Sequence, residues 1–330
     1  AVISFFPIKT LSEHRPLFLL AVAAVYFSAC LTLNQMILQA LNHIRLSQIV
    51  EKLGRPLLLI VFVGLFRWIA DSSVLDSQPL ILAATIATGG CSILVFSFIR
   101  QKREKYSAPV PAEPPAEHLS GKAFWFFSIS LLNLLGTKIT MLIIPWFAPQ
   151  AAIGIFNISY RFAELLIFPF FLMHTVLPQL FARHTAAERA YSQSLFSESN
   201  KLMTLLSIPL LLLNVVGGRF FLGWFGPDFV SGYTALLYIS LAQFLFAFFG
   251  PANTILMMQD KEKYSAGCLL VYVLILVVTS RLLIPVAGIT GGALAILIGS
   301  VAYNTLLAVV MWRLCRIRSP FFAFLVKTRQ

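Results

Sequence analysis

The sequence predicts an all-α membrane protein that crosses the bilayer many times. Hydrophobic residues make up 58% of the 330 residues, charged residues make up only 12%, and the mean hydropathy is +0.84. A soluble domain is closer to half apolar and a quarter charged. A hydrocarbon core about 30 Å thick requires about 20 consecutive apolar residues per helix. Nine runs of roughly that length follow one another along the chain, and they predict the fold class.

The first three apolar runs precede a linker. Residues 17–40 and 79–99 are long enough to cross a bilayer, whereas 54–70 is short for a span. Residues 100–121 begin with a basic patch and continue with several prolines, a composition that forms neither helix nor strand. We therefore expect 1–99 to be the remnant of an N-terminal helical lobe, separated from the rest by a cytoplasmic linker.

The six later runs predict a C-terminal six-helix lobe at 122–314, followed by a cytoplasmic tail at 315–330. The runs are 124–147, 152–182, 202–222, 232–257, 264–284 and 290–312. The first two are expected to form a helical hairpin that turns near 148–150. The run at 152–182 is long enough to tilt or to extend beyond the bilayer, and 183–200 is expected to hold a separate surface helix.

The net charge of +12 indicates topology rather than binding to nucleic acid. When the linker is placed in the cytoplasm and the spans alternate outward, most of the 25 lysines and arginines fall in or beside cytoplasmic loops. Such a bias orients helical membrane proteins with the positive residues inside. We therefore expect a cytoplasmic C-terminus, surrounding membrane lipids, and no nucleic-acid partner.

Two cations and one carboxylate lie deep inside the predicted spans. Lys138 precedes the expected turn by about the same distance as Arg161 follows it, so both lie at the same depth, roughly 17 Å below the turn. An ionisable residue at mid-membrane costs at least about 2.5 kcal/mol unless it faces a wet or paired interior. Lys138 and Arg161 are therefore expected to face one hydrated cavity. Glu164, one helical turn after Arg161, brings the local charge to a net positive value.

Two interpretations of this group stay open. Arg161 and Glu164 are three residues apart and can form an ion pair with no further role. Alternatively, the excess positive charge binds a phosphate-bearing ligand, because arginine contacts phosphate bidentately and lysine supplies a point charge. We then expect Lys138, Arg161, Asn157 and Tyr160 to contact substrate. Glu164 and His174 are the candidates for ion coupling, through reversible binding of a proton.

Amides and cysteines inside the spans are expected to serve packing. Asparagine and glutamine within membranes usually form hydrogen bonds between helices. They are Asn34, Gln35, Asn133, Asn157, Asn214, Gln243, Asn253 and Asn304. The four cysteines lack metal-ligand spacing, and neither paired carboxylates nor a nucleophile or phosphate-loop motif is present. The sequence thus predicts no enzyme, no cofactor and no metal site.

Four segments resemble bacterial polysaccharide flippases of the Wzx type, which belong to the multidrug/oligosaccharidyl-lipid/polysaccharide exporter superfamily. Residues 153–183 are similar to the second helix after the mid-chain linker of that family. Residues 218–264, with FGPDF and GPANTILMMQ, resemble its C-terminal region. Residues 286–295 are similar to its last loop and helix, and 33–60 to the loop between its fourth and fifth helices.

The resemblance implies two six-helix lobes around a central cavity in the bacterial inner membrane. Alternating access then moves an undecaprenyl-diphosphate-linked oligosaccharide, such as an O-antigen unit, between leaflets, with H⁺ or Na⁺ as a coupling ion. Arg161 falls where the resemblance places a cavity-facing cation. The chain has only three spans before the linker, so the first three helices, about 90 residues, are expected to be missing. Either the chain is a fragment or its first lobe is reduced.

Three other functions remain open on the sequence. A multidrug exporter of the same fold prefers cations and an acidic cavity. The net positive charge of Lys138, Arg161 and Glu164 disfavours this function. A membrane enzyme of lipid-linked glycan assembly needs a large external loop with arginine and histidine, and the predicted external loops are short. A purely structural membrane partner is the third. The sequence sets neither the glycan nor the oligomeric state.

Overall fold

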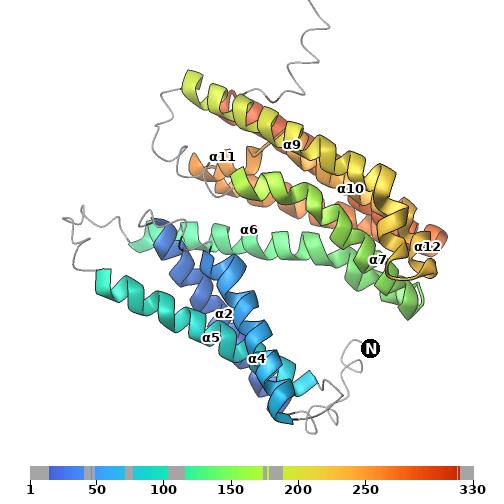
Figure 1. Ribbon diagram of the computed structural model, residues 1–330. Coiled ribbons are helices and arrows are strands. Elements are labelled where there is room, and N and C mark those ends of the chain that lie inside the picture. The colour runs from blue at the N-terminus through green and yellow to red at the C-terminus, as the bar shows by residue number, and fades with distance from the viewer. Residues whose placement is uncertain are drawn as a thin grey trace, which may run out of the picture. The chain divides into compact units, whose positions relative to one another are not determined.

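The computed structural model of the chain describes residues 15–40, 46, 49–70, 77–102, 116–173, 177, 189–317 and 319. Regular structure in these ranges is helical throughout, without a strand (Figure 1). The chain divides into two units, Ala1–Glu113 and Pro114–Gln330, which we call unit 1 and unit 2. The division falls within the predicted linker at 100–121.

Unit 1 consists of α2 (Arg15–Ala40), a short π-helical turn (Val50–Gly54), α4 (Arg55–Ala70) and α5 (Ser77–Lys102). α2 and α4 both pack against α5. The buried contact consists of small and aliphatic side chains that include Leu31, Leu38, Cys91 and Val95. Asn34 of α2 donates from Nδ2 to the backbone oxygen of Ser92 on α5 at 3.1 Å. The predicted use of amides to join helices is thus confirmed at Asn34.

Unit 2 is built around α10 (Tyr233–Phe249), an apolar helix with eight buried residues. Its other elements are α6 (Ala116–Ile143), η4 (Ile144–Trp146), α7 (Gln150–Glu164), η5 (Leu165–Ile167), α9 (Arg189–Gly223), η6 (Pro227–Gly232), α11 (Ala252–Met258) and α12 (Glu262–Cys315). α10 packs against α7, α9 and α12, and α6 packs mainly against α12. The core of unit 2 therefore lies along α10 and α12.

α12 folds back on itself in its middle. Pro285 lies inside it, and Gly288 has φ 56° and ψ −134°, a conformation outside the helical region. The rings of Tyr272 and Tyr303 have their centroids 5.1 Å apart, whereas a straight helix would separate these residues by roughly 45 Å. The two arms therefore run antiparallel. The predicted spans at 264–284 and 290–312 lie one in each arm.

Three predicted boundaries in unit 2 are wrong. The linker expected at 100–121 to form neither helix nor strand ends earlier, because α6 begins at Ala116, directly after Pro114 and Pro115. The span predicted at 232–257 is broken, because α10 ends at Phe249 and α11 starts only at Ala252. Gly250 has φ 82° there, and Pro251 lacks a backbone N–H for a helical hydrogen bond. The separate surface helix predicted within 183–200 is instead the first part of α9, which continues without interruption into the apolar span.

The chain is a multi-pass helical membrane protein. Within the ranges described above, six helical segments are long and apolar enough to cross a bilayer. They are Leu82–Arg100, Gly121–Trp146, Gln150–Met173, Tyr191–Gly223, Pro227–Phe249 and Glu262–Cys315. The apolar helices Val22–Leu38 and Pro56–Leu65 are shorter. The all-α membrane class is confirmed, while the count of nine spans and the two-lobed arrangement stay predictions.

Candidate substrate cavity

The predicted turn between α6 and α7 is present, but the two helices do not run side by side. The backbone oxygen of Ile144 accepts hydrogen bonds from the N–H groups of Phe147 and Ala148, both at 3.0 Å, and α7 begins at Gln150. Beyond the turn the helices diverge, α6 following α12 and α7 following α10 (Figure 1). The splay leaves space inside unit 2 that a closely packed hairpin would have filled.

A cavity of about 320 Å³ occupies this space. It is bounded by α6, α7, α10, α11, both arms of α12, and the segment that follows α7. Its lining residues are Asn133, Gly136, Thr137, Tyr160, Glu164, Ile167, Phe170, Phe171, Gln243, Phe246, Gly250, Pro251, Asn253, Leu269, Tyr272, Ile296, Tyr303, Asn304 and Leu307. Four amides and three tyrosines give it a polar interior within helices of spanning length.

Glu164 is the one acidic or basic side chain in this lining. Its Oε2 accepts a hydrogen bond from Nη1 of Arg161 at 2.9 Å, so the predicted pair one helical turn apart is confirmed. The Arg161 side chain is 63% exposed and does not belong to the lining. Arg161 therefore lies at the edge of the cavity and compensates the carboxylate charge from outside.

Lys138 does not line the cavity either, contrary to the expectation that both cations face one space. On α6, Gly136 faces the ring of Tyr272, and the hydroxyl of Thr140 lies 3.3 Å from that of Ser280, so this side of α6 packs on α12. Lys138 is two residues from each and lies on the opposite side of the helix. It is half-buried beside exposed leucines and has no hydrogen bond or ion pair with the described residues.

The other predicted site residues separate into three groups. Tyr160 is buried and lines the cavity as expected. Asn157, one turn earlier on α7, is exposed and does not line it. His174 lies outside the described residues, so its predicted role in ion coupling stays a prediction.

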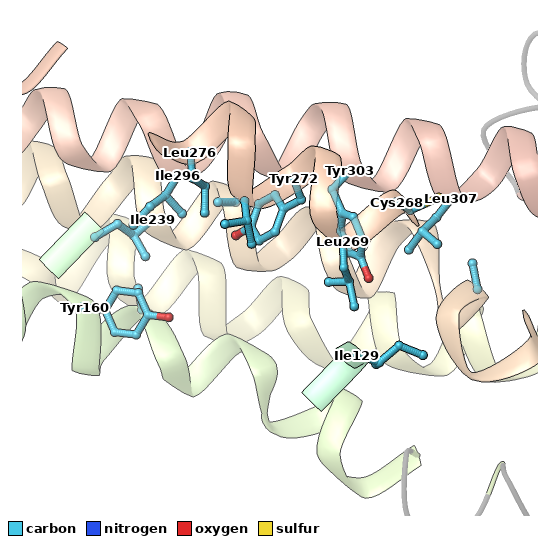
Figure 2. Close-up of a cluster of buried hydrophobic side chains, with 14 of the residues drawn as sticks. Ile129, Tyr160, Ile239, Cys268, Leu269, Tyr272, Leu276, Ile296, Tyr303 and Leu307 are labelled. Carbon is cyan, nitrogen blue, oxygen red and sulfur yellow. The ribbon is translucent and has the colours of Figure 1, made fainter. Parts of the chain in front are cut away.

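Aromatic rings form a continuous wall of the cavity. The ring centroid of Tyr303 lies 5.1 Å from that of Tyr272 and 5.9 Å from that of Phe246. Figure 2 shows Tyr272 and Tyr303 on α12, with Tyr160 on α7 across from them. The wall thus draws on both arms of α12 and on α10, elements that are far apart in sequence.

Gln243 is the residue that sequence reasoning left unrecognised. Its side chain is 5% exposed, lies beside the Tyr160 hydroxyl and lines the cavity, yet Oε1 has no hydrogen-bond partner. On the sequence, only Asn157 among the intramembrane amides is expected to contact substrate, and Gln243 is expected to serve packing. The sequence signal for a polar site was the presence of Tyr272 and Tyr303 at mid-span. A phenol within an apolar span needs a polar neighbour such as Gln243.

No family model matches this sequence, and comparisons with curated proteins and with solved structures likewise found no significant match.

Proposed function

We propose that this protein is an alternating-access transporter that flips an undecaprenyl-diphosphate-linked oligosaccharide across the bacterial inner membrane, with its C-terminus in the cytoplasm. The observation that carries the proposal is an amide- and tyrosine-lined cavity inside a bundle of membrane-spanning length. The resemblance of four segments to Wzx-type flippases gives the substrate class. Sites at mid-membrane, between helices that move relative to one another, are typical of transporters.

The chemistry of the cavity suits the glycan part of such a substrate. Amides both donate and accept hydrogen bonds, as sugar hydroxyls require. The Arg161 guanidinium at the cavity edge suits the diphosphate, because its planar donors match phosphate oxygens. Lys138, Asn157 and Tyr160 remain proposed contacts for the rest of the substrate, and Glu164 a proposed site for a coupling proton.

The test is surface display of lipid-linked glycan in cells whose own flippase gene is deleted. The protein should restore display, and Arg161→Ala should abolish it while the protein remains in the membrane. Lysine at the same position should restore part of the display, since the charge returns without the bidentate geometry. Normal display with Arg161→Ala would remove Arg161 from the site, and failure of the unaltered protein would refute the proposal.

A second function is favoured by one observation. Glu164 is the lone carboxylate in a lining that is rich in aromatic faces, and such faces attract organic cations. A multidrug exporter would use this arrangement. Efflux of tetraphenylphosphonium from intact cells distinguishes the two functions, because an exporter would expel the cation and lose that activity with Glu164→Gln. A glycan flippase would leave cation accumulation unchanged.

A further inference from the structure

The cavity wall contains the buried amide of Gln243, which meets the Tyr160 hydroxyl but leaves its acceptor oxygen Oε1 without a partner. The Gln243 side chain is 95% removed from solvent, and its Oε1 has no partner among the described residues. Buried polar groups are almost always hydrogen-bonded to protein or to ordered water. An unpaired oxygen on a cavity surface is therefore a place where a bound molecule with a hydroxyl or amide donor replaces water.

The rings beside it present a largely apolar surface, although their planes are tilted by 51° between Phe246 and Tyr303 and by 37° between Tyr303 and Tyr272. Phe246, Tyr303 and Tyr272 follow one another at centroid distances of 5.9 and 5.1 Å. Asn304 stands next to Tyr303 in sequence and also lines the cavity. A ligand that fits must therefore combine one apolar face with several hydroxyl groups at its rim.

The charge of the cavity selects against ions. Its lining contains no lysine or arginine, so a diphosphate placed inside would have no counter-ion there. Its one carboxylate, on Glu164, is already bonded to Arg161 at 2.9 Å, so an organic cation would have to compete for it. The cavity therefore favours a neutral ligand.

We infer that this cavity is a subsite for one or two uncharged sugar rings, held by hydrogen bonds to Gln243 and by packing on the Tyr303 and Tyr272 rings. A pyranose has this combination of an apolar C–H face and hydroxyl groups. The volume of about 320 Å³ lies at the lower end of small-molecule sites, which excludes a long oligosaccharide. The inference rests on the proposed function, and it places the diphosphate outside the cavity, on the Arg161 side.

The experiment is saturation-transfer difference NMR on the full chain in detergent, with galactose and N-acetylglucosamine as probes. Irradiation of aromatic protein protons should transfer strongly to the ring C–H protons of at least one sugar. Gln243→Leu should weaken that binding at least fivefold, and Tyr303→Leu should reduce the transfer to the C–H protons. Gln150→Leu, the same exchange at an exposed position off the cavity, should change neither.

Competition between sugar and ions on the unaltered protein tests the sugar subsite even if a variant fails to fold. Neither inorganic pyrophosphate nor tetraethylammonium should displace the sugar. Displacement by either ion, absence of transfer to both sugars, or equal binding by folded Gln243→Leu would overturn the subsite. Sugar binding without flipping of lipid-linked glycan would refute the proposed function alone, and flipping without sugar binding would refute the subsite alone.

Discussion

Two amides near α10 are almost equally buried but make very different contacts. Asn214 of α9 is 1% exposed and donates from Nδ2 to the backbone oxygen of Phe162 at 3.2 Å and to the Ser240 hydroxyl at 3.0 Å. Gln243, one turn further along α10 than Ser240, is 5% exposed and has an unpartnered Oε1 on the cavity. The first amide joins α9 to α7 and α10, whereas the second meets the Tyr160 hydroxyl of α7 and leaves its Oε1 without a partner on the cavity.

The difference shows that burial alone does not separate a structural amide from a candidate binding amide. Hydrogen bonds between membrane helices contribute about 0.6 kcal/mol on average, up to about 1.7. A buried polar group without a partner costs about 1–3 kcal/mol. The protein therefore gains stability at Asn214 and loses it at Gln243, which is consistent with a group retained for a ligand.

The largest effect on stability is expected from Asn214→Leu. This change removes both hydrogen bonds and leaves the Ser240 hydroxyl buried without a partner, so the free energy of unfolding should fall by about 2 kcal/mol. Unfolding in detergent by increasing amounts of SDS measures it. Gln150→Leu, at an exposed site, should stay within about 0.5 kcal/mol of the parent. An unchanged unfolding midpoint for Asn214→Leu would show that Asn214 is not a structural amide.

Gln243→Leu should affect glycan flipping more than stability. Stability should fall less than with Asn214→Leu, because the change removes an unsatisfied buried oxygen but also takes the polar neighbour of the Tyr160 hydroxyl away. Glycan flipping should fall about tenfold, which corresponds to about 1.4 kcal/mol. Initial rates in proteoliposomes that contain a fluorescent lipid-linked oligosaccharide measure the loss. A destabilised but fully active variant would assign Gln243 to packing, as the sequence had suggested.

Glu164→Gln should have a smaller effect on stability and a specific effect on coupling. The Arg161–Glu164 pair is partly exposed, so its loss should cost less than about 1 kcal/mol. Flipping should continue down a substrate gradient but no longer respond to an imposed pH gradient. Rates with and without a pH step across the proteoliposome membrane test this. A rate that still follows the pH step would exclude Glu164 as the coupling group.

The smallest effect is expected from Lys138→Ala. Lys138 lies on the side of α6 turned away from α12, off the cavity, so binding of neutral sugar and the unfolding midpoint should not change. If Lys138 contacts the diphosphate, affinity for a lipid-diphosphate analogue should fall a few-fold in a titration. Equal affinity would remove Lys138 from the substrate path.

Several features follow from local sequence alone. The apolar runs predict the helices, the break near 148–150 predicts the α6–α7 turn, and the three-residue spacing predicts the Arg161–Glu164 pair. Each depends only on hydrophobicity or on the helical repeat, which act over a few residues. The depth of Lys138 along α6 follows from the same repeat.

The tertiary structure alone decided which side of each helix meets the cavity. The splay of α6 from α7 depends on α10 and α12, which begin about seventy and about a hundred residues after α7 ends. That packing turns Lys138 away from the cavity and brings Gln243, Tyr272 and Tyr303 together around it. It also gives Asn214 two partners and leaves one oxygen of Gln243 with none. Sequence spacing fixes height along a helix, whereas the direction a side chain faces depends on neighbours that only the folded chain supplies.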